Sequence, residues 1–151
     1  MDKAQTIKSE AEALLSKMID KYEVEVKEDN GIFQVVVKTE DEVSTVIGRH
    51  GETIRAIQKI LEVILYKQLG EAVDILVNVN DFREKQKEKL EALASEYAAK
   101  AENSNEAVEI KDLSSYERKL IHEYITSNFP SLTTFSVGEG RDRKLIIEAK
   151  K

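Results

Sequence analysis

The stretch that decides the fold is VSTVIGRHGETIRAIQKILEVIL, at residues 43–65. A short apolar run leads into the turn GRHG at residues 48–51, and a helix follows whose apolar residues recur at helical spacing. The glycines keep side chains out of the turn, and the first amides of the next helix have no partners within the helix. A phosphate backbone can lie on such a turn, beside the fixed charge of Arg49 and the titratable His50. Taken alone, however, the pattern is better interpreted as a tight turn that merely needs small residues.

The composition limits the function classes. The chain has 151 residues, of which 41% are hydrophobic and 34% charged, as in a soluble globular protein of one domain or two small ones. It contains no cysteine, which excludes thiol nucleophiles, disulfides and Cys-ligated metal sites. The net charge of −6 argues against coating nucleic acid through bulk electrostatics, so any nucleic-acid site must be local. With no apolar leader and no apolar run of about 18 residues, we expect a cytoplasmic protein without membrane insertion.

The first half predicts the order helix, strand, strand, helix, helix, strand. Helical spacing covers residues 3–21, valine-rich strands cover 23–28 and 32–38, and Asp29-Asn30-Gly31 supplies a hairpin turn. A short helix at 40–47 leads into the GRHG turn, a long helix follows from Glu52 to Leu69, and residues 73–79 alternate as a strand. The long helix has so much apolar surface that we expect it to be covered on two sides. The residues concerned are Ile54, Ile57, Leu61, Ile64 and Leu65 on one face, extended by Ala56, Ile60 and Val63.

The second half begins with a highly charged helix at residues 81–102, which carries a thin apolar stripe. A short strand at 108–110 precedes a helix that Ser114 and Glu117 open at capping-box spacing, and this helix must stop before Pro130. Strands at 132–137 and 143–149 follow, joined by a glycine-rich loop. We therefore place a domain boundary near Asn80, which gives domains at residues 1–79 and 80–151, with the charged helix in the second. The apolar stripe consists of Phe82, Leu90, Leu93 and Tyr97.

Arg118 and His122 form a second candidate site. They are separated by four positions on the capped helix, so their side chains project from the same side, and we expect both to be exposed. The apolar stripe of this helix points largely the other way and consists of Leu113, Tyr116, Leu120 and Tyr124. A guanidinium suits a phosphate and an imidazole ring suits stacking or hydrogen bonding, which are contacts that single-stranded nucleic acid uses. For two residues alone, an ordinary polar helix face is the better interpretation.

The first half resembles a KH domain of type II, the arrangement α-β-β-α-α-β. The resemblance rests on the apolar lead-in Val46-Ile47, the GRHG turn, the amphipathic helix that begins Glu52-Thr53-Ile54, and the order of the flanking elements. KH domains clamp about four nucleotides across the GXXG loop. The resemblance implies a groove formed by Ile47, Gly48, Arg49, His50, Gly51, Ile54 and Arg55.

The second half resembles an R-3-H domain, a small single-strand-binding module named for its Arg-x-x-x-His spacing. The signature lies in YERKLIH at residues 116–122, and SVGEGRDRKLII at 136–147 is similar to the closing hairpin of that family. The implied fold class is α+β, with a type II KH domain followed by an R-3-H domain in which helices pack on a small sheet. The implied nucleic-acid contacts are Arg118, His122, Arg141, Arg143 and Lys144.

The combination resembles the bacterial Jag family, the SpoIIIJ-associated proteins, over nearly the entire chain. The resemblance implies a single-stranded RNA-binding protein, with single-stranded DNA as a further ligand, linked to cell elongation, cell shape, division or sporulation. It implies no enzymatic activity, no catalytic residues, and no metal or other cofactor. It also implies a partner, either a second copy or a small single-KH protein, on the second face of the helix at 52–69. The other interpretation of that face is that it packs on the helix at 81–102.

Two departures from the family pattern are visible. Family members commonly carry an additional amino-terminal domain, whereas this sequence starts at the helix before the KH sheet. Gln86 stands where a second arginine often follows the first, Arg83, which weakens one expected cationic contact. The alternative function is a protein-interaction adaptor whose acidic charge leaves nucleic-acid binding weak or vestigial.

Overall fold

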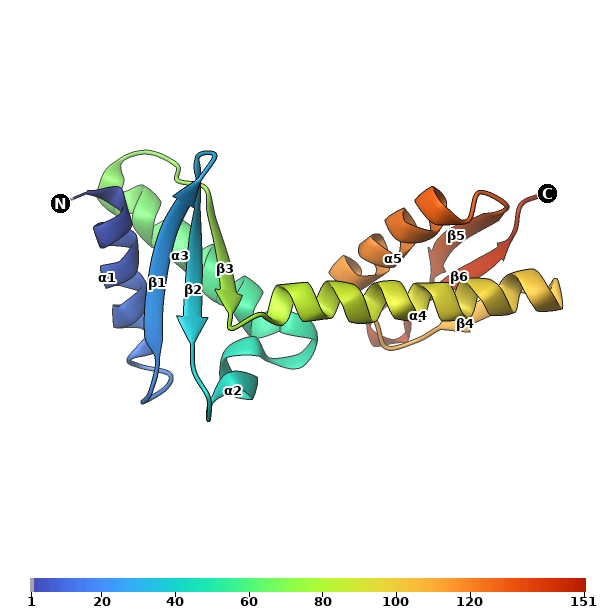
Figure 1. The fold of residues 1–151 in the computed structure, drawn as a ribbon, viewed down its shortest axis with the longest axis horizontal. Coiled ribbons are helices and arrows are strands. Elements are labelled where there is room, and N and C mark those ends of the chain that lie inside the picture. Colours follow the sequence, from blue (N-terminus) through green and yellow to red (C-terminus); the bar gives the residue numbers. More distant parts are fainter. Residues whose placement is uncertain (1) are drawn as a thin grey trace. The chain divides into compact units, whose positions relative to one another are not determined.

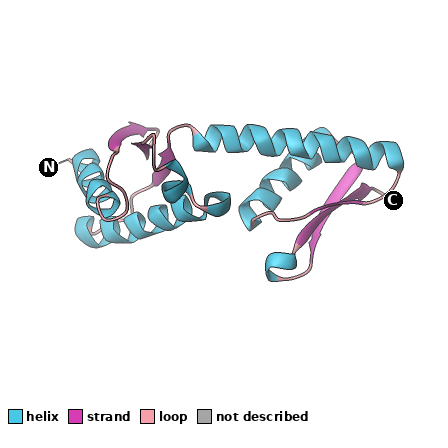
Figure 2. Cartoon of the chain, turned by 90° about the horizontal axis from the view of Figure 1, so that it is seen from below, coloured by secondary structure: helices cyan, strands magenta, loops and turns pink. Residues whose placement is uncertain are grey.

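The computed structural model describes residues 2–151, which divide into two compact units (Figures 1 and 2). The first unit ends at Arg83 and the second begins at Glu84. No helix among the described residues combines the length and the apolar character that crossing a bilayer requires.

The first unit has the order α1-β1-β2-α2-α3-β3, with a single 3-10 turn between α2 and α3. The hairpin turn is as predicted, because Asn30 and Gly31 both adopt positive φ, 51° and 83°, as a two-residue turn between twisted strands requires. The predicted order of elements is thereby confirmed. The bounds are α1 Lys3–Leu15, β1 Glu23–Asp29, β2 Ile32–Lys38, α2 Val43–Ile47, η1 Arg49–Gly51, α3 Glu52–Leu69 and β3 Ile75–Val79.

The sheet of this unit has the strand order β1-β2-β3, antiparallel between β1 and β2 and parallel between β2 and β3. Alternate residues of β2, at Phe33, Val35 and Val37, are buried, as the period of a strand requires. They pack with buried residues of α1 and α3, so both helices cover the same face of the sheet (Figure 1).

Two helices are shorter than predicted, for identifiable reasons. Helix α1 ends at Leu15, not at residue 21, because the amides of Lys17 and Met18 bond to carbonyl groups three residues back and tighten the chain into a turn. Helix α2 starts at Val43, because the carboxylate of Glu42 accepts hydrogen bonds from the loop before β1 and not from a helical turn of its own.

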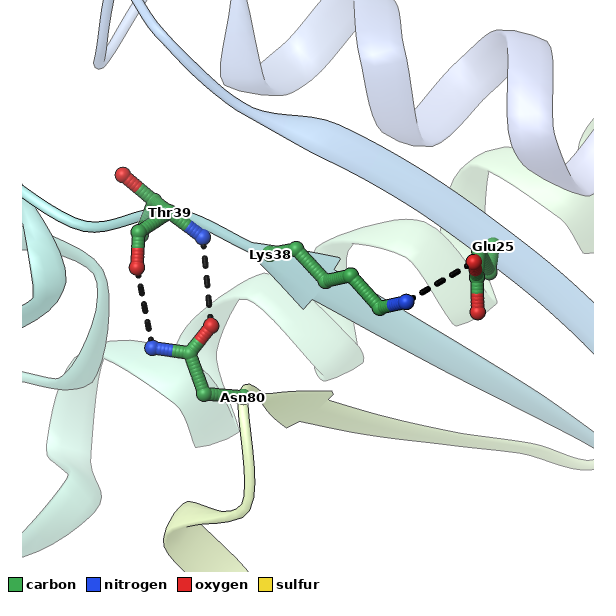
Figure 3. A network of polar contacts seen from close by, with 4 residues as sticks. All are labelled: Glu25, Lys38, Thr39 and Asn80. Atoms are coloured by element: carbon green, nitrogen blue, oxygen red, sulfur yellow. Dashed lines mark hydrogen bonds and ion pairs between the residues drawn. The ribbon is translucent and has the colours of Figure 1, made fainter.

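Polar contacts hold the end of β2 to the residue that follows β3 (Figure 3). The side chain of Asn80 donates to the Thr39 carbonyl at 2.9 Å and accepts from the Thr39 amide at 3.2 Å, which copies a backbone pairing. Asn80 tolerates the positive φ of 51° that this turn demands. Nearby, Lys38 pairs with Glu25 across β1 and β2.

The second unit contains most of α4, two further strands around α5, and a closing strand. Its three-stranded sheet has the order β4-β6-β5, antiparallel throughout. The predicted capping box is present, because the Ser114 hydroxyl accepts from the Glu117 amide at 3.2 Å and the Glu117 carboxylate accepts from the Ser114 amide at 2.8 Å. The bounds are α4 Phe82–Ser104, β4 Val108–Ile110, α5 Ser115–Asn128, β5 Leu132–Val137, η2 Gly140–Asp142 and β6 Lys144–Ala149.

The apolar faces of the helices in this unit differ from the predicted ones. On α4, the fully buried residues are Leu90 and the alanines at 94, 98 and 101, while Leu93 and Tyr97 are only partly buried. On α5, the centre of the buried face is Ile121 and Ile125. The alanines of α4 belong to the same core cluster as Ile110, Ile121 and Ile147, so small residues form a core face that a search for bulky ones misses.

The first unit leaves the second apolar face of α3 exposed. Ile60, Val63 and Tyr66 expose 46%, 59% and 60% of their surfaces, and the prediction that a partner or the helix at 81–102 covers this face stays a prediction. The predicted α+β fold class, by contrast, is confirmed by the order of elements and by the two small sheets.

Candidate nucleic-acid interface

Gly48 opens the GRHG turn in a conformation that other residues avoid. Its φ is 72° and its ψ is 178°, in a region that is essentially restricted to glycine. A Cβ at this position would lie 2.9 Å from the backbone nitrogen of Thr53 and closer still to the Thr53 hydroxyl. Residue 48 therefore cannot carry a side chain while α3 begins where it does.

Gly51 closes the turn in the left-handed conformation, with φ 76° and ψ 17°. The preceding residue, His50, also has a positive φ, 57°, which is uncommon outside glycine. The guanidinium of Arg55 stabilises this arrangement, because its Nη1 donates to the His50 carbonyl at 2.9 Å. Arg55, one of the predicted nucleic-acid contacts, is therefore held beside the turn by this hydrogen bond.

The turn leaves the start of α3 suited to an anion. Gly51 is the N-cap residue and has no side chain to satisfy the first amides of the helix, which carry partial positive charge. Arg49 is exposed and His50 is half-buried on the same turn. Glu52, also exposed in the first helical turn, is the opposing charge here. The positive character of the turn therefore comes from Arg49, Arg55 and the helix end, and it is local.

The two predicted apolar groove residues lie in different surroundings. Ile54 is 2% exposed and belongs to the core of the first unit, where its side chain supports the start of α3. Ile47 is partly buried and packs against the same core. Only Ile47 of the pair keeps surface next to the turn.

A groove of about 440 Å³ lies beside the first turns of α5 in the second unit. It brings together Arg118, His122 and Arg143, all of them predicted contacts. Lys119 adds a further cation, and no carboxylate lines the groove, so its charge is opposite to the net charge of the chain. The remaining lining residues are Ser115, Thr134, Phe135, Ser136 and Leu145.

The side chains in this groove are oriented by neighbouring groups. Arg118 donates to the Leu113 carbonyl at 2.7 Å and to the Ser115 hydroxyl at 3.1 Å, which leaves the other guanidinium donors for a ligand. The Nδ1 atom of His122 forms a hydrogen bond with the hydroxyl of Thr134, a buried residue on β5. The ring of His122 therefore presents its Nε2 edge away from the sheet.

The three predicted cations of the closing hairpin do not act as one cluster. Arg143 lines the groove and donates to the Gly138 carbonyl at 2.9 Å. Lys144 instead pairs with Glu109 at 2.8 Å, and that hydrogen bond lowers the pKa of the Glu109 carboxyl. Arg141 is exposed on η2 and does not line the groove. Successive strand residues point to opposite faces, which explains why Arg143 and Lys144 separate.

Sequence analysis missed several polar residues of the groove. Lys119, Thr134 and Ser136 line it, but only pairing of β5 with β6 beside α5 brings them together. Thr134 and Ser136 share one face of β5, a signal that strand alternation supplies once the strand is known. Tyr116, expected on the buried side of α5, is 39% exposed.

Comparison with known proteins assigns a family to each half. The family model for the KhpA/KhpB KH domain matches residues 8–77, and the model for the R-3-H domain matches residues 88–149. The chain belongs to the Jag family. The GRHG turn falls within the KH match, and the groove beside α5 falls within the R-3-H match, so both candidate sites of this Jag-family chain lie in domains of known type.

Several relatives of this Jag-family chain carry the name RNA-binding protein KhpB. The one from Bacillus subtilis is 26% identical over 152 residues, which cover 100% of this chain and 73% of that protein. The one from Lactiplantibacillus plantarum is 32% identical over 105 residues, covering 70% of this chain and 32% of that protein. The one from Clostridium symbiosum is 29% identical over 111 residues, covering 74% of this chain and 50% of that protein.

Proposed function

We propose that this protein binds single-stranded RNA through two sites, the GRHG turn and the groove beside α5. The observation that carries the proposal is the occurrence of two local cationic sites in a chain of net charge −6. The first is a turn at a helix start with Arg49 and His50 between two glycines, and the second is a groove lined by Arg118, His122 and Arg143. The name RNA-binding protein that its relatives carry supports the same ligand.

We propose that the two sites contact different parts of the RNA. At the turn, Gly48 and Gly51 adopt the backbone conformations that place the start of α3 beside the RNA backbone, Arg49 and Arg55 supply charge, and His50 lies between the two glycines. Bases held there are read on their edges, as in other KH domains. The groove engages the backbone with Arg118 and Arg143 and a base with the ring of His122, with little base selectivity. Arg141 and Lys144 are proposed to add long-range attraction only, because they do not line the groove.

Further parts of the proposal follow the family. We propose two domains, KH and R-3-H, divided between residues 79 and 84, and a binding function without catalysis in the cytoplasm. A role in cell elongation, cell shape, division or sporulation belongs to the same proposal, as does binding of single-stranded DNA.

The exposed face of α3, with Ile60, Val63 and Tyr66, is proposed to pair with a second KH domain, from another copy or from a small KH protein. If the wild type is a dimer in solution and the Val63→Glu variant has the same mass, that pairing surface is refuted.

The test of RNA binding is a fluorescence anisotropy titration with short single-stranded RNA at two salt concentrations. The test variant is Arg49→Asp with His50→Asp, and the matched control is Lys8→Asp with Ser9→Asp. When histidine is counted as neutral, replacing the cation by aspartate changes the net charge by −2 and replacing the neutral residue changes it by −1, so the two double variants change the net charge equally. All four residues belong to the first unit. We expect loss of binding in the first pair only. Equal affinity of both pairs, or no binding by the wild type, would favour the adaptor function instead.

A further inference from the structure

The ring of Phe82, the first residue of α4, lies against the GRHG turn. A Cβ at Gly51 would come within 3.2 Å of Phe82 Cε2 and 3.4 Å of Arg55 Nη1. Phe82 is half-buried and packs against the core of the first unit. Gly51 is therefore restricted twice, by its left-handed conformation and by this aromatic contact.

The next residue, Arg83, ties the same turn of α4 to β3 and α3. Its Nε donates to the Val77 carbonyl at 2.6 Å, and its Nη2 donates to Gln58 Oε1 at 3.1 Å. The same Gln58 oxygen accepts from the Val77 amide at 3.0 Å, which closes a ring of hydrogen bonds. The backbone amide of Arg83 is satisfied by the side chain of Asn78 at 3.1 Å, a residue that is 7% exposed.

These contacts make the first turn of α4 a part of the first unit. Strand β3 is at the edge of its sheet, and the amide and the carbonyl of Val77 are both satisfied by side chains, not by a further strand. The first compact unit accordingly ends at Arg83, although α4 continues to Ser104. Arg83 thus links α3, β3 and the first turn of α4.

The GRHG turn needs such support. His50 and Gly51 both have positive φ, and conformations of this kind persist only where the surroundings hold them. Thr53 lies next to Gly48, Arg55 donates to the His50 carbonyl, and Phe82 lies against Gly51. Thr53 and Arg55 belong to α3 itself, whereas Phe82 contacts the turn from a different helix, α4.

We propose that Phe82 and Arg83 are positioning residues of the nucleic-acid site at the GRHG turn. Phe82 holds Gly51 in its left-handed conformation at the start of α3, and Arg83 keeps Phe82 in place through Val77 and Gln58. Because the turn is ordered before RNA binds, binding does not carry the entropy cost of ordering it. Both residues therefore raise the affinity for RNA without contacting it. This inference rests on the proposed RNA binding.

The test uses full-length variants and two measurements, the affinity for a short single-stranded RNA of mixed sequence and amide hydrogen exchange at residues 48–53 without RNA. Phe82→Ala is compared with Tyr97→Ala, which removes a partly buried aromatic from α4 at the core of the second unit. We expect Phe82→Ala to weaken binding about tenfold, the equivalent of about 1.4 kcal/mol, roughly the cost of ordering one backbone residue. Exchange in the turn should accelerate, and Phe82→Tyr should restore both properties. Tyr97→Ala should change neither.

Arg83 is tested by Arg83→Gln against Lys87→Gln, which removes the same charge from an exposed position of α4. We expect faster exchange and weaker binding in the Arg83 variant only. Wild-type affinity and wild-type exchange in Phe82→Ala would overturn the inference, and so would equal effects of Arg83→Gln and Lys87→Gln. Failure of the proposed function is recognised separately, because then the wild type itself does not bind RNA, or Arg49→Asp with His50→Asp binds as well as the wild type.

Discussion

Replacing Gly48 by alanine tests whether the GRHG turn is built as the structure shows. Gly48 and Gly70 stand before and after α3, with nearly equal φ of 72° and 75°. Their surroundings differ, because a Cβ at Gly48 meets the backbone of Thr53, whereas a Cβ at Gly70 meets nothing within 4 Å. Their ψ also differs, 178° at Gly48 and 7° at Gly70, so Gly70→Ala is a control that carries the cost of a left-handed alanine without the glycine-only conformation and without the collision.

The expected magnitudes follow from these differences. Gly70→Ala should lower the free energy of unfolding by about 1 kcal/mol, the cost of the left-handed region for a residue with a Cβ. Gly48→Ala adopts a region restricted to glycine, which costs about 2 kcal/mol. Crowding against Thr53, which the helix holds in place, adds about 1 kcal/mol. The total for Gly48→Ala is about 3 kcal/mol, so the two variants should differ by about 2 kcal/mol.

The assay is urea unfolding followed by the amide NMR signals of the first unit, which reports on this unit separately from the second. The midpoint should fall in both variants with an unchanged slope, and further in Gly48→Ala. RNA affinity should fall for Gly48→Ala and stay at the wild-type value for Gly70→Ala. Equal midpoints for the two variants would show that neither the glycine-only conformation of residue 48 nor the collision with Thr53 exists in solution, and would refute a turn that requires glycine at this position.

Three further outcomes are expected. Arg118→Ala should weaken binding to unrelated RNA sequences equally and flatten the slope of log affinity against log salt by about 0.7, the value for one phosphate contact on a single strand; loss confined to one sequence would contradict this. Ser114→Ala should cost about 1 kcal/mol of stability in the second unit, because the Glu117 amide loses its cap, and a change below a few tenths of a kcal/mol by urea unfolding would argue against the capping box. Lys144→Met should raise the pKa of Glu109, measured by carbon NMR, because the hydrogen bond that lowers it disappears. Because the pKa of Glu109 is lowered in the folded protein, the ion pair stabilises the fold at pH values above the ordinary glutamate pKa of about 4.3, and this stabilisation is lost as the pH falls through the folded pKa. If Lys144→Met left the titration of Glu109 unchanged, the pairing would be refuted.

The parts of the fold that sequence analysis predicted well depend on neighbours in the chain. The turn at Asn30 and Gly31 sets its own backbone conformation, and β5 at residues 132–137 follows from alternation alone. The capping box of Ser114 and Glu117 joins residues three positions apart. Errors occurred where a distant partner decides, as at the start of α2, where Glu42 bonds to the loop before β1.

For the candidate sites, too, features set by nearby residues could be predicted and features set by distant residues could not. The GRHG turn and the Arg118–His122 spacing are visible in the sequence, because each lies within one or two turns of helix. The burial of Ile54, the pairing of Lys144 with Glu109 and the inward direction of Arg83 are not visible there. Each depends on which residues the sheet or the next helix places alongside.

The amino-acid sequence by itself determined the order of elements, the two glycines of the turn and the local character of the positive charge, because these depend on backbone preference, residue period and composition. Only the tertiary structure decided which cations line the groove. Arg143 lines the groove and Lys144 does not, because Arg143 is the extended residue just before β6 and Lys144 is its first residue, and successive extended residues point to opposite faces of the sheet. Phe82 meets Gly51, about thirty positions away in the chain, because β3 returns alongside α3 and brings the first turn of α4 to the GRHG turn. Pairing of distant segments is a property of the packed core, and no local pattern in the sequence specifies it.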